Sequence, residues 1–132
     1  MDITPLLSRN LNSITGYSSN GIKINDKLIN YDIILSPQNL LIWQNQSGID
    51  DPGSYIQIIE EIENQAYNNI ILIIGTGNRY IPNLQLVRAL FKKHNLAPEI
   101  MSTSNACHTY NVLVTEGRVV YAMLVVQAEP SF

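Results

Sequence analysis

Hydrophobic and polar residues alternate over short stretches in the first third of the chain, which is the period of a β-strand. Residues 22–29 read Ile-Lys-Ile-Asn-Asp-Lys-Leu-Ile, with two residues at the centre that favour tight turns. This pattern predicts a β-hairpin. Two further strands are predicted at residues 32–36, which end before a proline, and at residues 40–43.

Three later segments place apolar residues three or four positions apart, which is the period of an α-helix. The first follows Pro52 and carries glutamates on its other side, and the second opens at Pro82. The third is capped by Ser102 or Thr103 and ends before Gly117. The apolar positions of the three helices are Tyr55, Ile58, Ile59, Ile62 and Ala66; Leu84, Val87, Leu90 and Phe91; and Ala106, Tyr110 and Leu113.

Strands and helices alternate in the second half of the chain. Residues 69–74 and 119–126 are nearly continuous apolar runs, which is typical of strands that are covered on both faces. A short strand is predicted at residues 98–101. This order predicts an α/β fold with helices on the faces of a mixed central sheet, to which the early hairpin adds antiparallel strands. We expect residues 1–132 to form one domain.

The charge pattern narrows the possible functions. The 132 residues carry a net charge of −3, only 14% are charged, and no block of like charges occurs. The sequence therefore lacks the basic footprint of a nucleic-acid-binding protein.

No apolar run is long enough to span a bilayer, and residues 1–11 do not resemble a secretory signal. With a single cysteine, which excludes a disulfide within the chain, these features predict a cytoplasmic protein.

The first candidate site is the segment Gly75-Thr76-Gly77, between a buried strand and a helix. Loops that leave the carboxyl ends of parallel strands form the binding edge of open α/β sheets. Glycines there allow backbone N–H groups to approach a ligand, and Arg79 is close enough in sequence to pair with an anion. Tyr80 stands where a dinucleotide fingerprint requires glycine, and a phosphate-binding Gly-Lys-Ser/Thr triplet is absent. A tight turn with no ligand is the competing interpretation.

The second candidate is the helix start that contains Thr103, Asn105 and Cys107. A helix N-terminus lowers the pKa of an exposed thiol, so a reactive Cys107 is one hypothesis. His108 is adjacent in sequence and points about 100° away on a helix, which does not favour a Cys–His pair. A buried, unreactive cysteine is the alternative. No spacing of cysteine and histidine is typical of a metal site.

The third candidate is the joint between the last helix and the last strand. Glu116 and Arg118 are predicted to form an ion pair that holds the helix end. The functional alternative is that Asn111 and Arg118 line a small anion pocket. Two aromatic residues, Tyr17 and Trp43, lie beside polar segments, where they serve either as lids of the core or as partner contacts.

A family resemblance emerges from these motifs taken together. The order is Ile-Gly-Thr-Gly at residues 74–77, Met-Ser-Thr at residues 101–103, Ala-Cys-His-Thr-Tyr-Asn-Val-Leu at residues 106–113 and Glu-Gly-Arg-Val-Val at residues 116–120. The chain resembles the MTH938-like family, also called DUF498, over about residues 14–126. This family includes mitochondrial complex I assembly factor 3 and bacterial relatives of unknown function.

The resemblance implies a three-layer α/β fold with a mixed central sheet, and no cofactor. It implies a non-catalytic interaction or assembly role, with a protein partner and a possible homodimer. The alternative is a small-molecule or anion-binding protein, or an enzyme of unknown reaction. Its ligand site would be formed by Gly75, Thr76, Gly77, Thr103, Asn105, Cys107, Asn111 and Arg118. The chain departs from the family pattern at His108, where many relatives carry arginine, which would make an anion pocket weaker or pH-dependent.

Overall fold

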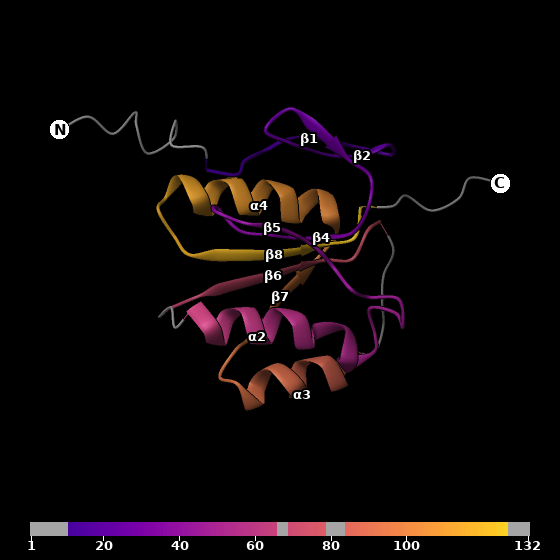
Figure 1. Cartoon of the computed structure of the whole chain (residues 1–132), viewed down its shortest axis with the longest axis vertical. Helices are drawn as coiled ribbons and strands as arrows, with labels where there is room; N and C mark the ends of the chain where they lie inside the picture. The colour runs from indigo at the N-terminus through magenta and orange to yellow at the C-terminus, as the bar shows by residue number, and fades with distance from the viewer. Residues whose placement is uncertain (1–10, 66–68, 79–83, 127–132) are drawn as a thin grey trace.

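The computed structural model describes residues 11–65, 69–78 and 84–126, and its centre is a five-stranded sheet (Figure 1). The strand order is β5-β4-β8-β6-β7, where β4 is antiparallel to β5 and β8, and β6 is parallel to β7 and β8. The bounds are β4 (Ile33–Leu35), β5 (Leu40–Ile42), β6 (Ile71–Gly75), β7 (Glu99–Met101) and β8 (Val120–Leu124). The predicted mixed sheet is confirmed, and the two apolar runs form its adjacent strands β6 and β8.

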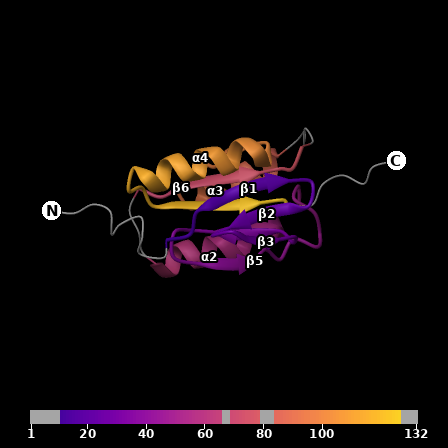
Figure 2. The same cartoon turned by 90° about the horizontal axis from the view of Figure 1, so that it is seen from above.

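A separate three-stranded antiparallel sheet covers one side of the molecule (Figure 2). It consists of β1 (Ile14–Ser18), β2 (Gly21–Ile24) and β3 (Lys27–Ile29). The predicted hairpin is β2–β3, and its two turn residues have φ values of 51° and 69°, as a type I′ turn requires. The expectation that this hairpin extends the central sheet is wrong, because it pairs with β1 instead. Strand β1 was not predicted separately.

The helices lie on both faces of the central sheet (Figure 1). Helix α4 (Thr103–Thr115) is packed between the two sheets, whereas α2 (Ile56–Gln65) and α3 (Gln85–Lys93) cover the opposite face. A 3-10 turn, η1 (Pro52–Tyr55), leads into α2, and the Asp51 carboxylate accepts a hydrogen bond from the Gly53 N–H at its start. The predicted roles of Ala66 and Pro82 in the first two helices lie outside the described residues.

Two hydrophobic cores result from this layering, one on each face of the central sheet. The core under α4 includes Ile22, Ile73 and Tyr110, and the core under α2 and α3 includes Ile58 and Phe91. Alternate residues of β8 serve the two cores, which explains why this strand is apolar throughout.

Trp43 belongs to the second core and is not a surface contact. Only 2% of it is exposed, and its indole N–H donates to the Ser54 carbonyl oxygen at 2.7 Å. Its ring lies 5.5 Å from that of Tyr55, which in turn lies 5.4 Å from that of Phe91. This aromatic row joins the residue after β5 to η1 and α3, so the core interpretation of Trp43 is confirmed.

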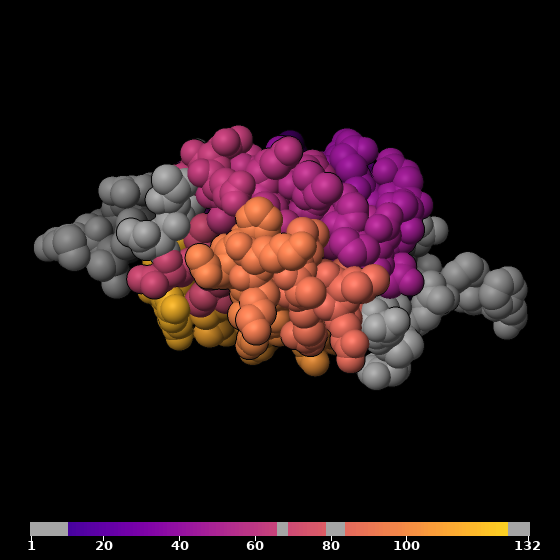
Figure 3. Space-filling model, turned by 90° about the horizontal axis from the view of Figure 1, so that it is seen from below, coloured from indigo at the N-terminus to yellow at the C-terminus, as the bar shows by residue number. Residues whose placement is uncertain are grey.

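Helices α2 and α3 lie side by side on the face that Figure 3 shows. The His94 Nδ1 atom lies 2.7 Å from a carboxylate oxygen of Glu63, which links the C-terminal ends of the two helices. His94 is also the C-cap residue of α3.

Candidate functional site

The end of β6, the start of α4 and the end of β8 meet at one edge of the central sheet. The Thr76 N–H donates to Met101 O, the Thr103 N–H donates to Gly77 O, and the Val125 N–H donates to Gly75 O, each at 2.9 Å. The structure thus brings residues 75–77 and Thr103 together, as predicted. The backbone groups of these residues form hydrogen bonds with one another and with Met101 and Val125.

Thr103 is the centre of this edge. Its side chain is fully buried, and its hydroxyl accepts a hydrogen bond from the Gly77 N–H and donates one to Val125 O, both at 2.7 Å. One hydroxyl therefore joins three segments that lie far apart in the sequence. Ser102, rather than Thr103, is the N-cap of α4.

Gly75 allows α4 to pack closely against β6. A Cβ atom at this position would lie 3.0 Å from Thr103 Cα and 3.1 Å from Ala106 Cβ. These distances are shorter than ordinary van der Waals contacts, so any larger residue would push the helix from the strand. Gly77 has a φ of 83°, which favours glycine for the turn itself.

Cys107 lies inside the core between α4 and the sheets, with 5% of its surface exposed. Burial raises the pKa of its thiol to about 12, so the thiol is neutral near pH 7. His108 is exposed on another side of the helix. This geometry agrees with a structural cysteine and not with a Cys–His pair.

Asn111 holds β1 against α4. Its side-chain oxygen accepts a hydrogen bond from the Ile14 N–H at 2.9 Å, and its side-chain nitrogen donates to Ile14 O at 2.6 Å. The Tyr110 hydroxyl donates to Asn12 O at 3.0 Å. The Thr-Tyr-Asn motif thus supplies the link between the helix and the small sheet.

Asn105 has an exposed side chain, and its backbone N–H donates to the Ser102 hydroxyl at 3.3 Å. Arg79 and Tyr80 lie outside the described residues. The ligand site predicted at this edge stays a prediction. Titration with inorganic phosphate, followed by the amide NMR signals of Gly77 and Asn105, would test it.

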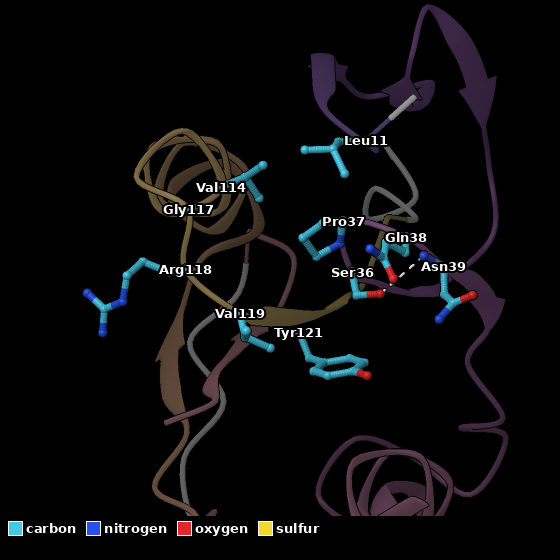
Figure 4. A pocket seen from close by; sticks show the side chains of 10 residues that line it. All are labelled: Leu11, Ser36, Pro37, Gln38, Asn39, Val114, Gly117, Arg118, Val119 and Tyr121. Atoms are coloured by element: carbon cyan, nitrogen blue, oxygen red, sulfur yellow. Dashed lines mark hydrogen bonds between the residues drawn. The ribbon is translucent and has the colours of Figure 1, made fainter. Parts of the chain in front are cut away.

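Arg118 lies at the other end of α4, beyond its C-terminus, so the structure does not place it beside the glycine segment. It lines a cavity of about 280 Å³ between the β4–β5 turn and the α4–β8 joint (Figure 4). The other lining residues are Leu11, Ser36, Pro37, Gln38, Asn39, Val114, Gly117, Val119 and Tyr121.

Within the described ranges no ion pair joins Glu116 to Arg118, so the expectation of an ion pair at the end of α4 is wrong. The backbone fixes this joint instead, because the Arg118 N–H donates to Leu113 O.

The sequence alternative of a small pocket lined by Asn111 and Arg118 named Arg118 but no other residue of this cavity. Asn111 lines two neighbouring cavities, of about 240 and 320 Å³, and not the one beside Arg118. The walls of the Arg118 cavity come from three segments that are distant in sequence, namely Leu11, residues 36–39 and residues 114–121, and most of its lining residues are ordinary apolar or turn residues. Such a set carries no motif, so the sequence alone could not have identified the other residues that line the cavity.

The described part of the chain contains neither a cluster of metal-ligating side chains nor a membrane-spanning helix. No three histidine, cysteine or carboxylate side chains come together there as a metal site would require. None of the helices described, moreover, combines the length and apolar character needed to cross a bilayer.

The chain is similar to one protein family and to several named proteins. A family model described as "Protein of unknown function (DUF498/DUF598)" matches residues 14–125. Assembly factor 3 of the NADH dehydrogenase (ubiquinone) 1 alpha subcomplex from Rattus norvegicus is 32% identical over 112 residues, and the human protein of that name is 31% identical over 116. Each alignment covers 85% of this chain and 59% of the relative, so the chain spans about three-fifths of their length.

A bacterial relative and two solved structures add to this comparison. The 13 kDa major membrane protein of Francisella tularensis is 33% identical, over 73% of this chain and 76% of that protein. A Bordetella parapertussis protein has a TM-score of 0.70 at 26% identity, covering 89% of this chain and 97% of its own. A Bordetella pertussis protein described as an Mth938-like domain has a TM-score of 0.60 at 23% identity, covering 98% and 91%, and supports the fold.

Proposed function

This chain belongs to the DUF498 family, and on that premise we propose that it is a non-catalytic protein-interaction module that helps to assemble a larger complex. The names of its curated mammalian relatives, which are assembly factors of NADH dehydrogenase, support respiratory complex I as the kind of complex concerned.

This proposal is carried by one observation, which is that the polar residues of the family motifs hold the fold together. Thr103 and Asn111, the two most promising polar side chains of those motifs, are both occupied by hydrogen bonds to backbone groups of other segments. Cys107 is buried with a neutral thiol. Groups that are fully engaged in holding a fold are poorly placed to bind or transform a substrate, since substrate binding would have to break those bonds.

A deletion strain of the source cell is the direct test. Without the chain, we expect less fully assembled NADH dehydrogenase on native gels and an accumulation of partial assemblies. Expression of the wild-type chain should restore the complex. Affinity capture with the tagged chain, quantified by mass spectrometry, should enrich subunits of the partial assemblies. Unchanged amounts of the assembled complex in the deletion strain would contradict the proposal.

A second copy of this chain is one partner that the proposal includes. Sedimentation of the purified chain over a range of concentrations measures this directly. A concentration-dependent dimer supports a homodimeric assembly factor, and a monomer at every concentration removes self-association from the proposal.

We place the protein in the cytoplasm within this proposal. The Francisella relative, described as a major membrane protein, favours attachment to a membrane surface as a second candidate. Cell fractionation separates the two. The chain should remain in the soluble fraction, whereas recovery in the membrane fraction after a high-salt wash would favour the membrane-associated role.

A further inference from the structure

The cavity beside Arg118 has the size of a site for one apolar side chain. Its volume of about 280 Å³ is just below the range of about 300–1,000 Å³ in which drug-sized ligands bind. Its walls are formed largely by Leu11, Pro37, Val114 and Val119, with the ring of Tyr121 at its base (Figure 4). Pockets of this kind hold the central anchor residues of protein interfaces.

Hydrogen bonds hold one wall of the cavity in place. The Asn12 backbone N–H donates to Pro37 O at 2.7 Å, and its side-chain nitrogen donates to Ser36 O at 2.9 Å and to Asn39 O at 3.1 Å. The Ser36 hydroxyl also accepts a hydrogen bond from the Asn39 N–H at 3.2 Å. The β4–β5 turn is thereby fixed, so a partner would lose little free energy in ordering it.

The rim of the cavity is polar, and one positively charged residue lies beside it. Gln38 and Arg118 are exposed, and in the part of the chain that the structure describes their side chains form no hydrogen bond or ion pair. The Arg118 guanidinium extends away from the cavity in Figure 4, and no described residue holds it there. Rotation about its side-chain bonds is therefore free to bring the charge toward a carboxylate at the mouth.

We propose that this cavity is a docking site for a partner protein segment in which an aliphatic side chain is followed by an acidic residue. The aliphatic side chain enters between Pro37, Val114 and Val119, and the acidic residue pairs with Arg118. This inference rests on the proposed function and adds the chemistry of the partner to it.

Three short peptides test the site on the whole chain. The first probe is acetyl-Gly-Leu-Glu-Gly-amide, the second replaces its glutamate with glutamine, and the third replaces its leucine with alanine. We expect the first peptide to shift the methyl NMR signals of Val114 and Val119. The glutamine peptide should bind about threefold more weakly, as the loss of an exposed ion pair predicts. The alanine peptide should bind about tenfold more weakly, because it buries less apolar surface.

Two pairs of variants identify the cavity as the site. Val114→Phe fills it, and Val112→Phe makes the same change on an exposed position of the same helix outside it. Binding should be lost in Val114→Phe and kept in Val112→Phe, with both chains folded as judged by their amide spectra. In Arg118→Gln, the glutamate and glutamine peptides should bind equally well, because the charge that distinguishes them is gone.

Two results would overturn the inference. These are the absence of methyl shifts at millimolar peptide, and equal binding of the glutamate and glutamine peptides to the wild-type chain. The docking site and the proposed assembly role can be tested independently of each other. If Val114→Phe captures assembly partners as well as the wild type does, the chain is still an assembly factor and this cavity is not its docking site. If the peptides bind as expected and the deletion strain assembles its complex normally, the docking site stands and the assembly role fails.

Discussion

The two ends of α4 differ in how their polar groups are used. At the N-terminal end, Thr103 is fully buried and hydrogen-bonded to Gly77, and both Thr103 and Gly75 are hydrogen-bonded to Val125, which follows β8. At the C-terminal end, Arg118 and Gln38 are exposed beside a cavity of about 280 Å³ and form no side-chain hydrogen bond among the described residues.

This contrast shows that a conspicuous sequence motif does not by itself indicate a binding or catalytic site. The glycine and threonine residues at the first end look like a ligand loop in the sequence, and they serve to bring three chain segments into contact. The cavity at the second end is formed by ordinary residues. The predictions below measure whether the first end supports the fold and the second end is free to bind.

Replacing Thr103 with valine should have the largest effect on stability. The change keeps the shape of the side chain and removes both hydrogen bonds, so the Gly77 N–H and Val125 O lose a partner in a buried place. We expect the free energy of unfolding to fall by about 3 kcal/mol, measured by urea denaturation. Thr115→Val, on an exposed position of the same helix, is the control and should change little. Equal stability of the two variants would contradict the structural role of Thr103.

Replacing Asn111 with alanine should have the next largest effect. The variant loses both hydrogen bonds to Ile14, which attach the small sheet to α4. We expect a loss of about 2 kcal/mol in unfolding free energy and faster amide hydrogen exchange in β1 than in β8. Asn105→Ala is the matched control, because its side chain is exposed. Unchanged exchange in β1 would show that the small sheet is attached mainly by apolar contacts.

Raising the pH should destabilise the fold through Cys107. Burial raises the pKa of this thiol from 9.0 to about 12, so above pH 9 the unfolded chain loses a proton that the folded chain retains. The stabilising contribution is complete below pH 9 and is lost as the pH rises toward 12. Burial also raises the pKa values of Tyr55 and Tyr110, which adds to the same trend. Urea midpoints should fall less steeply with pH in Cys107→Ala than in the wild type. Equal slopes would mean that the thiol is accessible to water.

Replacing Arg118 with glutamine should have the smallest effect on stability. The side chain is exposed and has no ion pair within the described ranges, so we expect a change within about 0.5 kcal/mol by urea denaturation. Thr103→Val provides the comparison at the opposite end of the helix. A loss above about 1 kcal/mol would show that Arg118 supports the joint between α4 and β8, and the contrast between the two ends would disappear.

Most elements of the fold were predictable because their signals are local. The type I′ turn follows from Asn25 and Asp26, and the start of α4 follows from Ser102. Its end follows from Gly117, which has a φ of 79°. The small sheet was only partly predictable, because the attachment of β1 to α4 depends on contacts such as Asn111 with Ile14, which are 97 residues apart.

The candidate site was less predictable than the fold. Gly77 and Thr103 meet at one edge of the sheet, whereas Arg118, which was grouped with them, lies at the opposite end of α4. The role of each residue depends on whether its polar atoms find partners. That is decided by burial and by the distance to other segments, neither of which is local.

By itself, the sequence determined the class of the fold, the type of each main element and the family, because periodicity, caps and turn residues act over a few positions. Only the tertiary structure decided that the side chains of Thr103 and Asn111 are hydrogen-bonded to other segments, that Cys107 is buried, and that an open cavity lies beside Arg118. The physical reason is that a hydrogen bond or a cavity forms between segments brought together by packing, and the free energy of that packing belongs to the whole chain.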